Sequence, residues 1–217
     1  MIKVFSHTEP GGHARNEDAF AVQLHGHDSE SFLCVVADGQ GGRAGGEAAA
    51  QLACRALLTA AGGYSATDLL RPSRWSGILH TVDQAVFTDP SAGLTTVVAF
   101  YLTGDHVCGA SCGDSAAVLL QATKPAEVLT ARQVKNPPLG SGDASFVAFA
   151  AEMSSPWTVM AMSDGVWKYA GWDNVVKIAT EMRGEEIIPS IRDCAKLQKS
   201  GELQDDFTIV VFQNVGN

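Results

Sequence analysis

The sequence predicts an α+β fold. Short runs of apolar and β-branched residues recur along the chain, which is typical of buried strands. Stretches with the 3.6-residue period of amphipathic helices come in two blocks, and several consecutive strand-like runs lie between the blocks. Strand and helix alternating throughout would instead favour a doubly wound α/β sheet.

The apolar runs define the expected strands, which are 19–24, 32–37, 95–101, 107–110, 116–120, 147–151, 158–162 and 207–212. The expected helices are 47–61, 69–87, 172–182 and 189–198. The clearest of them, 47–61, has one apolar face and ends at Gly62-Gly63, while Pro189 suits the first turn of the last. Residues 136–144 are rich in proline and glycine and are expected to form a loop.

Composition limits the classes of function. The 217 residues suit a single domain spanning 1–217, and a formal net charge of -9 argues against nonspecific binding to nucleic acid or to an acidic membrane. Five cysteines without a paired zinc-ligand spacing are expected to be reduced and buried. No apolar run has the length of a signal peptide or a membrane span, so a cytoplasmic location is expected.

Carboxylates follow the strand-like runs at several points. Asp-Gly comes directly after an apolar run twice, at Asp38-Gly39 and at Asp164-Gly165. Either pair alone is a common turn signal. Further acids at similar junctions are Glu17, Asp18, Asp114, Asp205 and Asp206. If these groups converge, their mutual repulsion calls for a cation, and all-oxygen ligation suits Mg²⁺ or Mn²⁺.

Five short motifs occur in a fixed order. They are Arg-Asn-Glu-Asp-Ala-Phe at 15–20, Val-Ala-Asp-Gly-Gln-Gly-Gly at 36–42, Cys-Gly-Asp-Ser at 112–115, Met-Ser-Asp-Gly at 162–165 and Asp-Asp-Phe-Thr at 205–208. Together they resemble the metal-dependent protein phosphatase (PPM) family, the type 2C serine/threonine phosphatases. Gly-Leu-Thr-Thr at 93–96 resembles the family's Gly/Thr-rich strand start, and the resemblance runs from Arg15 to Val211.

The resemblance implies a four-layer α-β-β-α sandwich, in which two antiparallel sheets are flanked by helices. It also implies two Mn²⁺ or Mg²⁺ ions at one end of the sandwich. Asp38 would bridge both ions and Gly39 would offer its carbonyl oxygen to one of them. Asp164 and Asp205 would complete the other, and Glu17 would reach the second ion largely through water.

Two further acids receive roles from the same resemblance. Asp18 would orient the neighbouring ligands, and Asp114 is the candidate for the weaker third ion of some relatives. Two cations lower the pKa of a shared water toward ~7, and this metal-bound water would attack phosphorus without a phosphoenzyme intermediate. The expected activity is hydrolysis of phosphoserine and phosphothreonine in proteins, opposed by a serine/threonine kinase.

The chain departs from the family pattern around the substrate phosphate. His13 stands where relatives usually carry the phosphate-binding arginine, which leaves Arg15 and His13 as candidates for that role. Gln40 replaces a histidine that many eukaryotic relatives carry, and an amide cannot act as a general acid. Only a short flap is expected beside the site, as in bacterial-type members, with 136–144 as its remnant.

Three alternatives remain open at this point. Residues 39–44 also fit the Gly-x-Gly-x-x-Ala form of a dinucleotide fingerprint, but Asp68 has no strand before it to complete that motif. A catalytically weak phosphatase-like module could bind a phosphoprotein or partner without turnover. Another two-metal phosphoesterase would also need an acid cluster, although the net charge speaks against polyanionic substrates.

Overall fold

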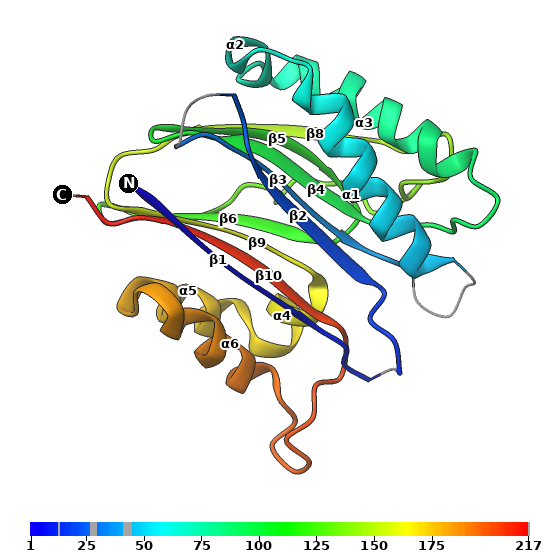
Figure 1. Ribbon diagram of the computed structural model, residues 1–217. Coiled ribbons are helices and arrows are strands. Elements are labelled where there is room, and N and C mark those ends of the chain that lie inside the picture. Colours follow the sequence, from blue (N-terminus) through cyan, green and yellow to red (C-terminus); the bar gives the residue numbers. More distant parts are fainter. Residues whose placement is uncertain (13, 27–29, 41–44, 217) are drawn as a thin grey trace.

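The computed structural model describes residues 1–12, 14–26, 30–40 and 45–216, and these form two packed antiparallel sheets (Figure 1). One sheet has the order β1-β10-β9-β6-β7 and the other β2-β3-β4-β5-β8. The strands of the first sheet are β1 (Ile2–Glu9), β6 (Ala116–Gln121), β7 (Lys124–Val128), β9 (Trp157–Met162) and β10 (Phe207–Asn214). Those of the second are β2 (Asp18–Leu24), β3 (Phe32–Asp38), β4 (Val97–Leu102), β5 (His106–Cys112) and β8 (Val147–Glu152).

Helices cover both outer faces of the sheet pair (Figure 1). The second sheet is covered by α1 (Gly46–Gly62) and α3 (Pro72–Phe87), with the short α2 (Ala66–Leu69) beside them. The first sheet is covered by α4 (Asp164–Ala170), α5 (Trp172–Glu181) and α6 (Ile187–Ala195), which follows the 3₁₀ turn Gly184–Glu186. The predicted four-layer α-β-β-α sandwich is therefore confirmed. Within the described ranges, every helix is too short or too polar to span a bilayer.

The continuous apolar strands reflect burial on both faces. In β3, Leu33 and Val35 pack against the helices, whereas Cys34 and Val36 face the other sheet. In β10 of the other sheet, Val210 and Phe212 face the core between the two sheets, whereas Ile209 and Val211 pack against helices α4–α6. Because successive side chains point to opposite faces, a strand between a helix layer and a second sheet needs apolar residues at every position. This is why the strands read as unbroken apolar runs.

Several boundaries differ from the sequence-based expectation. The helix expected over 69–87 begins at Pro72 instead, because proline has no N–H to continue an earlier helix, and Leu69 is the last residue of the short α2. Strand β7 was not predicted, since four of its five residues are exposed and it lacks an apolar run. Strand β1 was also missed, and it lies at the other edge of the same sheet.

Two more differences concern the C-terminal third. Asp164 and Gly165 read as a turn in the sequence but form the first turn of α4. Helix α6 ends at Ala195 rather than at 198, because Lys196 is extended. All five cysteines are free, and four are buried as expected, whereas Cys194 is exposed on α6.

Candidate active site

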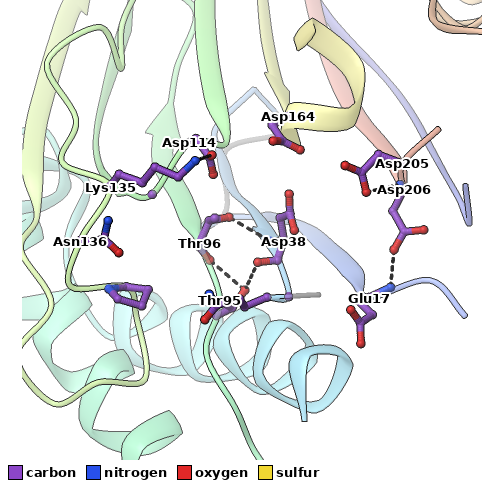
Figure 2. Close-up of a pocket in the computed structure, with 14 residues that line it drawn as sticks. Glu17, Asp38, Thr95, Thr96, Asp114, Lys135, Asn136, Asp164, Asp205 and Asp206 are labelled. Carbon is purple, nitrogen blue, oxygen red and sulfur yellow. Dashed lines mark hydrogen bonds and ion pairs between the residues drawn. The ribbon is translucent and has the colours of Figure 1, made fainter. Parts of the chain in front are cut away.

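One pocket of about 500 Å³ gathers the carboxylates that the sequence marked at strand ends (Figure 2). Its acidic lining residues are Glu17, Asp38, Asp114, Asp164, Asp205 and Asp206. They come from the start of β2, the end of β3, the β5–β6 turn, the start of α4 and the segment before β10. The two sheets therefore meet at this end of the sandwich with their acidic junctions facing one cavity.

Asp38 is held by the start of β4. The hydroxyl of Thr96 accepts a hydrogen bond from the Asp38 amide at 3.0 Å, and the Thr96 amide donates to the Asp38 carbonyl oxygen at 2.8 Å. The Thr95 hydroxyl donates to the same carbonyl oxygen at 2.8 Å. The two threonines thus fix the backbone of Asp38 without engaging its carboxylate, which remains available to a ligand (Figure 2).

Gly39 lies where backbones approach closely. Its amide donates to the Glu17 carbonyl oxygen at 3.0 Å, and a Cβ added at Gly39 would lie 2.4 Å from the backbone of Gly46. Only a residue without a side chain fits between β2 and the start of α1. The Asp-Gly pair therefore serves a packing need in addition to any role of Gly39 as a ligand.

Asp38 is a buried carboxyl group with several other carboxyl groups nearby. Burial raises the pKa of Asp38 to about 9, and the like charges of Asp18, Asp164, Asp114 and Asp205 add to the effect. Asp18 is directly opposite Asp38 in the antiparallel β2–β3 pair. Burial also raises the pKa of Asp18 to about 7, against the lowering effect of the Ser163 and Thr208 hydroxyls.

Asp164 opens α4 at the pocket edge. Burial raises its pKa, as does the neighbouring charge of Asp114, while Lys168 one turn later lies 3.3 Å from its Oδ2. Gly165 allows this placement, because a Cβ there would lie 2.0 Å from the Asp206 carbonyl oxygen. The helix start therefore presses directly against the segment that carries Asp205 and Asp206.

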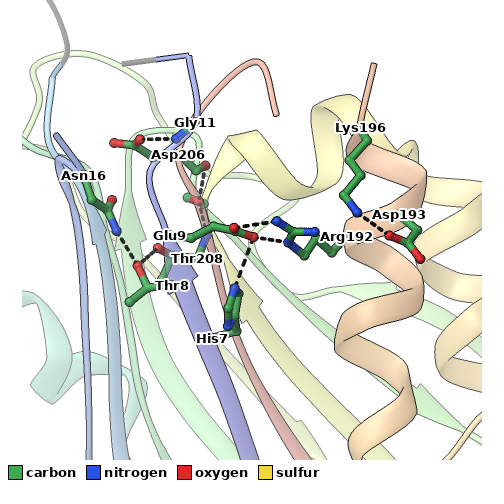
Figure 3. Close-up of polar contacts among 11 residues, drawn as sticks. His7, Thr8, Glu9, Gly11, Asn16, Arg192, Asp193, Lys196, Asp206 and Thr208 are labelled. Carbon is green, nitrogen blue, oxygen red and sulfur yellow. Dashed lines mark hydrogen bonds and ion pairs between the residues drawn. The ribbon is translucent and has the colours of Figure 1, made fainter. Parts of the chain in front are cut away.

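Asp206 lines the pocket, and its carboxylate also binds backbone amides of the N-terminal loop. Its Oδ1 accepts from the Gly11 amide at 2.9 Å and its Oδ2 from the Glu17 amide at 2.6 Å (Figures 2 and 3). The Asn16 side chain adds a hydrogen bond to Thr8 at 2.7 Å. Sequence reasoning noted Asp206 beside Asp205 but gave it no role, because its partners lie almost 200 positions away.

The loop 136–144, which the resemblance implied to be the remnant of a flap, contributes Asn136 and Pro138 to the pocket lining. Leu139 exchanges both backbone hydrogen bonds with Thr95 at 3.0 Å, which ties the segment to the start of β4. The buried carboxylate of Asp83 on α3 accepts from the Gly140 amide at 2.7 Å. Asp83 was missed by the sequence analysis, where it is one acid within a helical pattern.

Of the two predicted phosphate-binding residues, Arg15 is exposed on the loop before β2 and is not a lining residue, whereas His13 lies outside the described residues. Among the described residues, the basic side chain that lines the pocket is Lys135, which sequence reasoning did not single out. It forms an ion pair with Asp114, with Nζ 2.5 Å from Oδ2.

The donor set fits divalent magnesium or manganese. Among the described residues, no three histidine, cysteine, aspartate or glutamate side chains already form a cage that could hold an ion. Mg²⁺ does not need such a cage, because it keeps several waters and binds through one or two carboxylates. A pocket lined by carboxylates meets that requirement, and its oxygen donors do not suit softer metals.

Comparison with known proteins identifies the class. Residues 7–138 match the family model for protein phosphatase 2C, and no curated protein sequence matches the chain. Because this match covers more than half of the chain, the chain belongs to the protein phosphatase 2C family. The expected class, protein serine/threonine phosphatase, is thereby confirmed at the level of the family.

Solved structures share the fold over nearly the whole chain. The serine/threonine phosphatase PstP/Ppp of Mycobacterium tuberculosis has a TM-score of 0.79 at 20% identity, with 99% of each chain covered. The phosphatase Stp1 from Staphylococcus aureus has a TM-score of 0.77 at 17% identity, covering 100% of this chain and 96% of its own. RsbX, solved in complex with magnesium, has a TM-score of 0.74 at 14% identity, covering 98% and 94%.

Proposed function

We propose that this chain is a Mg²⁺- or Mn²⁺-dependent phosphatase that hydrolyses phosphoserine and phosphothreonine in proteins. The observation that carries the proposal is the convergence of six carboxylates on one pocket in a chain of this family. The proposal includes one phosphatase domain over 1–217, a cytoplasmic location and an opposing serine/threonine kinase. The single domain is supported by the solved structures, because the matches cover 94–99% of the length of those chains.

Five residues would hold two ions in this proposal: Glu17, Asp38, Gly39, Asp164 and Asp205. All of them line the pocket. When bound, the ions supply positive charge for the phosphoryl oxygens and lower the pKa of a water for attack on phosphorus. Asp18 supports the arrangement from the strand position opposite Asp38.

The chain's own residues keep the ligands in register for this chemistry. Thr95 and Thr96 fix the backbone of Asp38, and Asp206 fixes the amide of Glu17. Asp38 is held from the start of β4 and Glu17 from the segment before β10, so the site forms only when both sheets are packed together. Such fixed placement reduces the reorganisation that would otherwise accompany the reaction.

A phosphatase-like module that binds without turnover is the second candidate. It is favoured by the exposed Arg15 outside the pocket lining and by Gln40, which lines the pocket but cannot act as an acid. Both candidates require the pocket, and only the first requires release of phosphate.

Phosphate release from a phosphothreonine peptide in Mn²⁺, Mg²⁺ or EDTA separates the two candidates. Metal-dependent turnover is expected, and Asp38→Asn should abolish it. Asp193→Asn is the matched control, because Asp193 is an exposed aspartate on α6 outside the pocket lining. A folded wild-type chain that binds the phosphopeptide without releasing phosphate would favour the binding module. Full activity in folded Asp38→Asn would refute the assigned site.

A further inference from the structure

Lys135 is fixed on the far side of the pocket from Glu17 (Figure 2). The residue before it, Val134, accepts a hydrogen bond through its carbonyl oxygen from the Gly113 amide at 2.9 Å. The loop that carries the lysine is therefore tied to the turn that carries Asp114. From the other side, the Trp167 indole N–H donates to the Asp114 carbonyl oxygen at 3.0 Å. Asp114 is thus anchored through its own carbonyl oxygen, and Lys135 through that of the residue before it.

Asp114 differs from the other carboxylates in having a lysine inside the pocket. Among the described residues, Glu17, Asp38 and Asp205 take part in no ion pair. Lys168, the partner of Asp164, is not a lining residue, and its ammonium group lies over the Tyr169 ring at 5.3 Å from the centroid. Lys135 is therefore the positive side chain that the described part of the chain places within the acid cluster.

We infer that Lys135 is a built-in counter-ion that occupies the place where Asp114 would otherwise bind a third divalent ion, so that the pocket takes two ions. The inference rests on the proposed function for the other two. An ammonium 2.5 Å from a carboxylate oxygen takes up the coordination position of an ion on that oxygen. Its positive charge also repels an ion approaching the second oxygen.

The test counts bound ions rather than turnover. Mn²⁺ titrations followed by calorimetry and by the paramagnetic resonance of free Mn²⁺ are compared for the wild type, Lys135→Met, Asp114→Asn and the double variant. Two ions are expected in the wild type and in Asp114→Asn. Lys135→Met should bind a third ion at least tenfold more tightly than the wild type does, and the double variant should lose it again.

Two controls separate charge from general perturbation. Lys135→Arg keeps the charge and should gain no ion. Lys196→Met removes a lysine that pairs with Asp193 at 2.7 Å on α6, away from the pocket, and should also gain none. Lys135 is 71% exposed, so its replacement should leave the fold intact. Lys135→Gln repeats the measurement if the methionine variant does not fold.

The outcomes separate the two proposals. If Lys135→Met gains no Asp114-dependent ion, or if Asp114→Asn lowers the ion count of the wild type, the inference about Lys135 is wrong even when the proposed function holds. If the wild type binds no ion but Lys135→Met gains one that needs Asp114, the counter-ion role of Lys135 stands, whereas the two-ion count and the metal-dependent function both fail.

Discussion

Binding of Mg²⁺ to the metal-free chain should release about one proton from Asp38 at pH 7, and up to about half a proton more from Asp18, because a nearby cation favours the ionised form of each carboxyl. Burial and four neighbouring carboxylates raise the pKa of Asp38 to about 9. At pH 7 the group is two units below that pKa and is therefore roughly 99% protonated. The release should fall to about half a proton at pH 9 and almost vanish two units higher. An ordinary surface aspartate would release none.

Calorimetric titrations in two buffers of different ionisation enthalpy measure this proton directly. At pH 7 the observed heat should depend on the buffer with a slope of about one to one and a half protons per chain. Asp38→Asn lacks the Asp38 proton, so its slope should be smaller by about one proton for any ion that it still binds. Buffer-independent heats at pH 7 in the wild type would refute the reasoning, because they would mean that Asp38 is already ionised inside the acid cluster.

The same electrostatics and packing give three further predictions. In the metal-free chain, the folded-state pKa of Asp38 lies above its unfolded value of 3.8, so the folded state holds the extra proton. The free energy of unfolding should therefore fall as pH rises from about 4 to 9. Urea titrations with and without Mg²⁺ measure this, and a flat metal-free profile would contradict it. Asp206→Asn leaves one of two backbone amides, that of Gly11 or that of Glu17, without its acceptor. The variant should lower the free energy of unfolding by about 1–3 kcal/mol and weaken Mg²⁺ binding. Unchanged values of both would exclude a positioning role for Asp206. Gly165→Ala places a Cβ 2.0 Å from the Asp206 carbonyl oxygen and should lower the free energy of unfolding by about 1–3 kcal/mol, measured by thermal denaturation. The control Gly77→Ala adds its Cβ in open space on α3 and should raise the free energy of unfolding by about 0.5–1 kcal/mol.

The sequence was most informative where burial dictates composition. Strands β3, β4 and β9 are buried along almost their whole length, so each appears as an apolar run whose centre was predicted correctly. Strand β7 forms by pairing with β6 at the edge of its sheet, and its exposed residues carry no comparable pattern. The short α4 was hidden for another reason, since Asp164-Gly165 has the composition of a turn.

The candidate site was predictable in its residue types and not in its contacts. Acids at strand ends are visible in the sequence, and their order suggested the family that the comparison confirmed. The ion pair between Lys135 and Asp114 and the hydrogen bond from Gly140 to Asp83 join segments that only the folded chain brings together. Such contacts depend on the packing of the β5–β6 turn, the loop 136–144 and α3, and no local pattern encodes them.

Asp205 and Asp206 show how neighbouring carboxylates acquire different roles. Both oxygens of Asp206 already accept backbone amides, at 2.9 Å from Gly11 and 2.6 Å from Glu17. An ion at Asp206 would therefore have to displace a short hydrogen bond and leave a backbone amide without its acceptor, which costs about 1–3 kcal/mol. The Asp205 carboxylate accepts one hydrogen bond, from the amide of Asp206 at 3.1 Å. In the proposed two-ion site, Asp205 is thus the member of the pair that would bind an ion, and Asp206 holds in place the loop from which Glu17 reaches the pocket.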